Sequence, residues 1–159
     1  MAFKLGIFEL HTFCVPEYRH EPMCGEVRFD HEAQMMFRLL GQYGITSVIT
    51  SSSLVDSIEN INLSGIESLI DEICFHVTDR EEEIHRLLAC RDISPQDAFY
   101  VDDIACGIRQ AKRAGIVSTF GVIGGYDSRE RIIEEAPFYL APINSMARIT
   151  RIAYAQLGF

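Results

Sequence analysis

Short apolar runs alternate with amphipathic segments along the whole chain. The apolar runs have the length of buried strands, and the segments between them repeat apolar residues at helical spacing. The expected strands are residues 3–10, 46–51, 73–77, 98–102, 117–123 and 138–141. Helices are expected over residues 30–43, 54–69, 79–90 and 104–114, and the second of them is interrupted near residues 62–65. Two more helices are expected further on, one capped by Asp127 or Ser128 and a last one that begins near Asn144.

Regular alternation of strands and helices is typical of a parallel sheet with helices on both faces. We therefore predict a single α/β domain over residues 1–159, a three-layer Rossmann-like fold with a mostly parallel five- or six-stranded sheet. Residues 12–29 contain Pro16, Pro22 and Gly25 and show no sustained periodicity, which predicts a long loop or flap.

Composition narrows the class of protein. The chain has 159 residues, of which 14 are basic and 23 acidic, and a formal net charge of −9. This balance argues against nucleic acid as a partner, because such binders need a basic face. The apolar runs are too short to span a membrane, and the N-terminus lacks the long apolar region of a signal peptide, so we expect a cytoplasmic protein. Five scattered cysteines do not suggest a disulfide framework, and Cys74 and Cys106 are expected to be buried, reduced thiols.

Polar residues follow several expected strands directly. They are Glu9 to Phe13, Thr50 to Ser53, Thr78 to Arg80, and Asp102 with Asp103. Since the carboxyl ends of parallel strands meet at one crevice, we expect these residues to converge. Carboxylate oxygens suit Mg²⁺, and hydroxyl groups and helix N-termini suit phosphate. The joint pattern predicts a phosphate and Mg²⁺ site, whereas the alternative is that each strand end is polar only because it faces water.

Three segments of the chain, in the order in which they occur, resemble motifs of the haloacid dehalogenase (HAD) superfamily of phosphohydrolases. Tyr100-Val-Asp-Asp-Ile, with the helix that follows it, is similar to the fourth motif of that family. Val48-Ile-Thr-Ser51 is similar to the second motif, which implies Thr50 or Ser51 as the phosphate-binding hydroxyl. Leu5-Gly-Ile-Phe-Glu-Leu-His-Thr-Phe13 stands where the first motif belongs. The resemblance implies a HAD-like fold and chemistry of the phosphatase type.

The chain departs from the family pattern at the positions that carry catalysis. The family's first motif is Asp-x-Asp, in which the first Asp attacks phosphorus and the second is the general acid and base. Glu9 and His11 stand at these two positions, Arg80 replaces the lysine of the third motif, and Gly107 replaces a frequent acid of the fourth motif. Glu is one methylene longer than Asp, and a misplacement of roughly 1 Å can cost about 10²-fold in rate.

Two hypotheses for function follow. The first is a catalytically impaired HAD-like phosphohydrolase homologue that binds Mg²⁺, a phosphorylated ligand or a protein partner. The alternative is an active, divergent Mg²⁺-dependent phosphatase with Glu9 as nucleophile or base and His11 as general acid. In either case Arg80 is the residue expected to hold phosphate in place of lysine.

The sequence contains candidate ligands for two metal ions, Mg²⁺ and Zn²⁺. Glu9, Asp102 and Asp103 hold Mg²⁺ in one interpretation, whereas in the other a salt bridge with Arg80 balances their charge. Thiolate and imidazole groups of the flap suit Zn²⁺, but their spacing matches no standard zinc finger, and the alternative is that they are ordinary flap residues. The flap residues in question are His11, Cys14, His20, Cys24 and His31.

The segment between the first and second motif positions holds only the flap and one expected helix, so no cap domain is predicted. In the HAD superfamily, capless members act on large or protein-borne substrates or borrow a partner's lid. The expected partner is therefore a phosphorylated small molecule or a protein. Phe13, Tyr18, Met23 and Phe29 either contact that partner or pack back on the domain.

Overall fold

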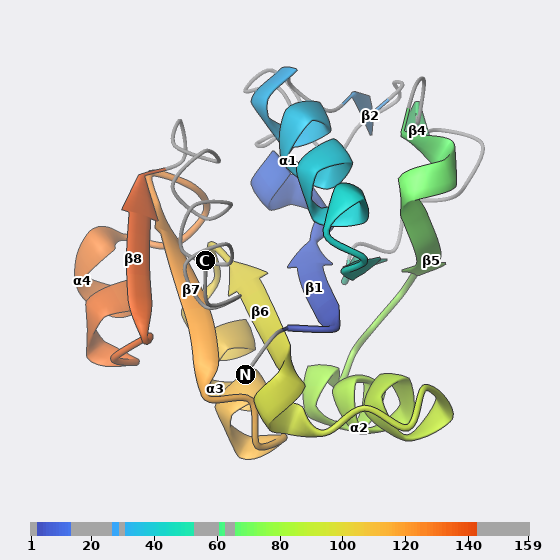
Figure 1. Ribbon diagram of the computed structural model, residues 1–159. Helices are drawn as coiled ribbons and strands as arrows, with labels where there is room; N and C mark the ends of the chain where they lie inside the picture. Colours follow the sequence, from blue (N-terminus) through green and yellow to red (C-terminus); the bar gives the residue numbers. More distant parts are fainter. Residues whose placement is uncertain (1–2, 14–26, 29–30, 53–60, 63–65, 143–159) are drawn as a thin grey trace.

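A computed structural model describes residues 3–13, 27–28, 31–52, 61–62 and 66–142, and these residues form a layered α/β structure (Figure 1). The main sheet consists of β1 (Leu5–Glu9), β3 (Thr46–Thr50), β5 (Ile70–Cys74), β6 (Ala98–Asp102), β7 (Ser118–Ile123) and β8 (Tyr139–Pro142). The α-helices are α1 (His31–Gln42), α2 (Arg80–Cys90), α3 (Ala105–Arg113) and α4 (Arg129–Glu134). None of the helices in the described ranges is long and apolar enough to cross a membrane.

The six strands of the main sheet are all parallel, in the order β5-β3-β1-β6-β7-β8. From β1 the chain moves outward through β3 to β5, and it then returns to β6 on the other side of β1. The strand order therefore reverses between β1 and β6. In open α/β sheets such a reversal opens a crevice outside the carboxyl ends of the strands, where ligands bind.

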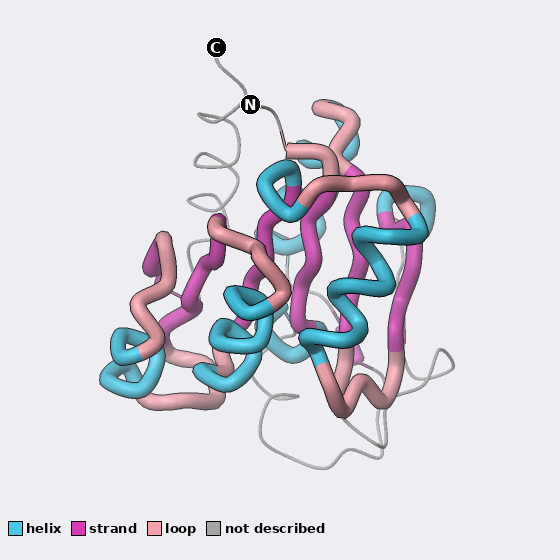
Figure 2. Tube along the Cα trace, turned by 90° about the horizontal axis from the view of Figure 1, so that it is seen from below, coloured by secondary structure: helices cyan, strands magenta, loops and turns pink. Residues whose placement is uncertain are grey.

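The helices cover both faces of the sheet. Helix α1 lies on one face, and α2, α3 and α4 lie on the other (Figure 2). Side chains alternate between the faces along each strand: Phe8 belongs to the core beneath α1, whereas Leu5, Ile7 and Tyr100 belong to the core beneath α2 and α3. The predicted three-layer architecture is confirmed, with six strands and a fully parallel sheet.

Two short strands form a separate ladder. β2 (Val27–Arg28) pairs in parallel with β4 (Ile61–Asn62), so the end of the predicted flap meets the segment between β3 and β5. The described part of the chain contains no cap domain, and between β1 and β3 it holds only a 3₁₀ turn (Leu10–Phe13), β2 and α1. Apart from Thr12, the side chains of the predicted flap lie outside the described residues, as does the helix expected from Asn144.

Most element predictions are confirmed, and two of them need correction, as does the expected burial of Cys106. The helix expected over 54–69 is wrong at residues 61–62, which form β4. Of the part of this range that the structure describes, Glu67–Leu69 is helical, as a 3₁₀ turn. The third strand is Ile70–Cys74 rather than 73–77, and His76 beyond it has a left-handed φ of 57°. Cys106 is half-buried rather than buried, whereas Cys74 is buried as expected.

Of the two residues expected to cap α4, Ser128 does so, and Asp127 has another role. The cap of α4 is Ser128, whose Oγ accepts from Arg131 N. Asp127 instead uses Oδ2 to accept from Ala105 N at 2.8 Å, at the start of α3, where the preceding residue Ile104 provides no side-chain cap. The loop after β7 therefore caps the helix that follows β6, and it ties these two segments together at the crevice.

Candidate functional site

Three polar side chains at the carboxyl ends of neighbouring strands face the same helix layer. Glu9 ends β1 and pairs in register with Thr50 of β3, and Asp102 ends β6. Each follows, two residues on, a side chain of the core beneath α2 and α3: Glu9 follows Ile7, and Asp102 follows Tyr100. The two-residue period of strands therefore aims Glu9, Thr50 and Asp102 at the start of α2. All three are at most 1% exposed.

Arg80, the first residue of α2, meets these side chains. Asp79 caps the helix by accepting from Glu82 N at 3.1 Å, which fixes where the helix begins. From there the Arg80 guanidinium reaches inward: Nη2 donates to Glu9 Oε2 at 3.2 Å and to Ser52 Oγ at 3.0 Å. Nε lies 3.6 Å from Asp102 Oδ2 and makes no hydrogen bond. Arg80 thus bridges the two buried carboxylates, and it is itself only 7% exposed.

The environment of Arg80 keeps it charged. Burial disfavours the charge, but the neighbouring Tyr100, Glu9 and Asp102 outweigh burial, so the pKa of Arg80 is raised. Glu9 also accepts from Thr50 Oγ1 at 3.4 Å. The carboxylate at the end of β1 is therefore held by a guanidinium and a hydroxyl together.

Asp102 turns toward the protein interior. Its Oδ2 accepts from the Tyr100 hydroxyl at 2.7 Å, and its Oδ1 accepts from Ile104 N at 2.9 Å. This position requires glycine at 107, because a Cβ there would lie 1.8 Å from Asp102 Oδ2. Burial first, and then the charge of Glu9, raise the pKa of Asp102 well above its ordinary value, while Arg80 opposes this shift.

Asp103 lies beyond the end of β6 and makes a separate set of contacts. Its Oδ1 accepts from Thr12 Oγ1 at 3.0 Å, and its Oδ2 accepts from Tyr126 N at 2.8 Å. A Cβ at Gly125 would lie 1.9 Å from Asp103 Oδ2, so glycine is needed for the loop to pass so closely. Asp103 therefore joins the turn after β1 to the loop after β7.

The structure thus brings together most of the residues that the sequence nominates. Glu9, Thr50, Arg80 and Asp102 contact one another, and Ser51 and Asp103 are buried beside them. Other nominated side chains lie elsewhere or are not described. Thr78 and Asp79 are exposed and line a different pocket. The side chain of His11 lies outside the described residues, as do Cys14, His20 and Cys24 of the zinc hypothesis.

One contributor, Tyr100, was not predicted from sequence, and two others, Ser52 and Thr12, lie in segments expected to converge but were not singled out as site residues. Tyr100 reads as an apolar strand residue, and only its place two residues before Asp102 indicates a shared face. Ser52 had a signal, since it belongs to the hydroxyl run after β3. Thr12 is bonded to Asp103, which is 91 residues away in sequence, and local spacing carries no information about such a pair.

A second polar cluster lies on the same face, beside β5. Glu72, Cys74 and Glu83 form the one group of three potential metal ligands within 4.8 Å of one another among the described residues. Arg86 Nη2 lies among them, 2.5 Å from Glu72, 2.6 Å from Glu83 and 3.5 Å from Cys74 Sγ. Burial and the neighbouring carboxylates raise the pKa of the Cys74 thiol. An arginine therefore balances this acidic cluster as well.

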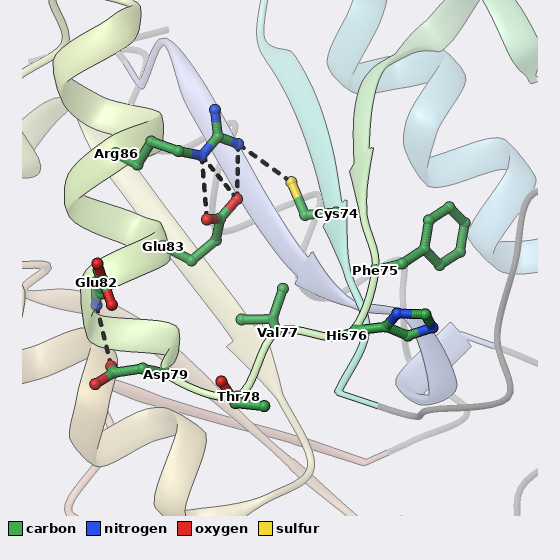
Figure 3. A pocket seen from close by; sticks show the side chains of 9 residues that line it. All are labelled: Cys74, Phe75, His76, Val77, Thr78, Asp79, Glu82, Glu83 and Arg86. Atoms are coloured by element: carbon green, nitrogen blue, oxygen red, sulfur yellow. Dashed lines mark hydrogen bonds and ion pairs between the residues drawn. The ribbon is translucent and has the colours of Figure 1, made fainter.

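Beside this cluster is a pocket of about 300 Å³ between α2 and the segment after β5 (Figure 3). Glu82, Glu83 and Arg86 come from the helix, and Phe75 and His76 come from the opposite segment. The dashed contacts in Figure 3 show Glu83 and Cys74 engaged by Arg86. The pocket is distinct from the crevice that holds Glu9 and Arg80.

Comparison with known proteins identifies the fold. No protein-family model matches the sequence, and no curated protein matches it. The cobalt-bound deoxy-D-mannose-octulosonate 8-phosphate phosphatase of Haemophilus influenzae is similar, with a TM-score of 0.75 at 13% identity, over 98% of this chain and 90% of that chain. A Streptococcus pneumoniae hydrolase of the haloacid dehalogenase-like family has a TM-score of 0.69 at 12% identity, over 96% of this chain and 98% of that chain.

A third structure agrees. The 3-deoxy-D-manno-octulosonate 8-phosphate phosphatase of Yersinia pestis has a TM-score of 0.70 at 16% identity, over 93% of this chain and 78% of that chain. The chain therefore has the HAD-like fold, as the sequence resemblance implied. At these identities the likeness establishes the fold, and the chemistry must be argued from the residues present.

Proposed function

We propose that this chain is a HAD-like phosphohydrolase homologue with impaired hydrolysis, which binds a phosphorylated small molecule at the crevice between β1 and β6. The observation that carries the proposal is the buried Arg80 guanidinium, held by Glu9 and Ser52 at the start of α2. A buried, permanently charged fork beside hydroxyl groups suits the oxygens of a phosphate.

The crevice around Arg80 offers hydrogen-bond donors to a phosphate group. The contacts of Arg80 with described residues use Nη2 and Nε, which leaves both N–H groups of Nη1 to a ligand. Thr50, Ser51 and Ser52 supply hydroxyl groups at the end of β3. The eleven-residue helix α2 begins at Arg80, and its N-terminus adds a favourable dipole for an anion.

Impaired hydrolysis follows from the residue at the end of β1. Glu9 replaces the aspartate that attacks phosphorus in the family, and its longer side chain is already held by Arg80 and Thr50. A carboxylate that balances a buried guanidinium is a poorer nucleophile than a free one, because attack would remove the partner of Arg80. Hydrolysis also needs a general acid, and His11 is the only residue predicted for that role.

The residues of the crevice suit a divalent cation less well than they suit a phosphate group. Glu9, Asp102 and Asp103 are the nominated ligands for Mg²⁺, and the fold is compatible with metal, since one neighbour is a cobalt-bound form. In this chain Arg80 contacts Glu9 and Asp102, and the three carboxylates do not form a close group among the described residues. The proposed phosphate binding therefore uses Arg80 and the hydroxyl groups.

The proposal is tested by titrating the protein with inorganic phosphate and with a phosphomonoester, using calorimetry. Arg80→Gln is expected to weaken binding by about tenfold or more, because a hydrogen bond to a charged group contributes about 1.5–3 kcal/mol. Arg86→Gln is the matched control, since it removes an arginine from the second cluster, and it is expected to leave the affinity unchanged. Equal affinities in wild type and Arg80→Gln would refute the proposed site.

A second variant guards against misfolding of Arg80→Gln, which leaves Glu9 without its buried partner. Arg80→Lys keeps the positive charge but loses the planar fork. We expect an intermediate loss of phosphate affinity in this variant, with circular dichroism matching that of the wild type.

A further inference from the structure

We propose that Arg80 is the resident cation of the crevice, so that the site binds the phosphate group of its ligand without a divalent metal ion. This inference rests on the proposed function, because it specifies how that same site binds its ligand. It differs from the metal-dependent interpretation that the sequence left open.

The first argument is the position of the guanidinium. Arg80 lies 3.2 Å from Glu9 through Nη2 and 3.6 Å from Asp102 through Nε. A metal ion that joined Glu9 Oε2 to Asp102 Oδ2 would have to occupy the place of the guanidinium. Arginine cannot escape this conflict by losing its proton, because it stays charged in proteins.

The second argument is the engagement of the remaining carboxylate oxygens. Both oxygens of Asp102 accept from the protein, from Ile104 N and the Tyr100 hydroxyl. Both oxygens of Asp103 do so as well, from Thr12 and Tyr126 N. Mg²⁺ requires nearly octahedral oxygens at about 2.0–2.1 Å, so each of these oxygens would have to serve the ion with the lone pair that its protein donor leaves.

The third argument is the direction of the side chains. The side chain of Asp102 is on the face of the sheet that α2 covers. Asp103 is the next residue, and successive side chains along a strand point to opposite faces. The contacts of Asp103 accordingly run to Thr12 and to the loop after β7, whereas Asp102 lies beside Arg80. Among the described residues, the one close group of potential metal ligands is at Glu72, Cys74 and Glu83, and there Arg86 is the cation.

The decisive experiment measures inorganic phosphate affinity of the wild-type chain in EDTA and again in excess Mg²⁺. The proposal predicts dissociation constants that agree within about twofold, which corresponds to a negligible free energy. An affinity that rises by about tenfold or more with Mg²⁺ would overturn the proposal. That outcome would leave the proposed function intact, because phosphate would still bind. Absence of binding in both conditions would instead refute the proposed function, and this inference with it.

A direct metal measurement supplies a second readout. Mn²⁺ titration followed by electron paramagnetic resonance is expected to show no stoichiometric site in the crevice. A stoichiometric Mn²⁺ site in the wild type that is lost in Asp103→Asn would contradict the proposal. Phosphate affinity in EDTA that is retained in Asp103→Asn but lost in Arg80→Gln would support it.

Discussion

Individual residues of the crevice have charges that depend on one another. Glu9 and Asp102 are both buried and share the Arg80 guanidinium, and the Tyr100 hydroxyl donates a hydrogen bond to Asp102. Two carboxylates beside one arginine disfavour double ionisation, and Asp102, which is fully buried, carries the raised pKa. Gly107 is what allows Asp102 to take this position, since any side chain there would collide with it.

The raised pKa of Asp102 makes stability depend on pH. In the unfolded chain this carboxyl loses its proton near its ordinary pKa of 3.8, whereas in the folded chain it keeps the proton to higher pH. Between these values the folded state binds the extra proton, so its stability falls as pH rises, by at most about 1.4 kcal/mol per pH unit. Asp102→Asn cannot titrate. Urea unfolding from pH 4 to 8 should therefore show the wild type losing stability relative to Asp102→Asn, and a constant difference would contradict this assignment.

At the scale of elements, the start of a helix and the end of a strand are stabilised by distant loops. Helix α3 begins at Ala105 without a cap from Ile104, and Asp127 provides the missing acceptor. This contact holds the loop after β7 over the crevice, where Tyr126 N donates to Asp103. The geometry around Asp103 thus depends on how α3 is capped.

Removing this cap has a predictable cost. Asp127→Ala should lower the free energy of unfolding by about 0.5–2 kcal/mol, the range for loss of a helix cap. Asp127 also forms an ion pair with Arg131, whose side chain is 61% exposed, so Arg131→Ala is the control and should have little effect. Urea denaturation of both variants decides the point. If the two substitutions were equally destabilising, the ion pair rather than the cap would be responsible.

Sequence patterns predicted elements well where local signals and packing agree. The strand Ala98–Asp102 has the expected bounds, and the helix expected over 79–90 ends at Cys90, with Asp79 as its cap. The errors lie where distant partners decide. Residues 61–62 form a strand only because they pair with Val27–Arg28. Strand β5 contains Asp71 and Glu72, which obscure its apolar pattern and are balanced by Arg91 and Arg86.

Over the whole molecule, the fold and the location of the crevice were predictable, whereas the sequence left alternatives open for the contacts inside it. Parallel alternation of strands and helices determines which strand ends meet, and this brought Glu9, Thr50 and Asp102 to one edge. An ion pair of Arg80 with these carboxylates was one of two interpretations of the sequence. Spacing along the chain could not choose it over a metal ion, because the contacts of Arg80 with Glu9 and Asp102 cross 71 and 22 positions of sequence. The fold is HAD-like, and Arg80 balances the charge of the carboxylates in its crevice.

The central claim is that the crevice binds phosphate but turns it over poorly. Its most direct test is phosphate release from a panel of phosphomonoesters and acetyl phosphate, with and without Mg²⁺, comparing folded wild type with Asp103→Asn. We predict no release above that of Asp103→Asn under either condition. Rapid turnover by the wild type that disappears in Asp103→Asn would contradict the account and would show that Glu9 supports efficient hydrolysis.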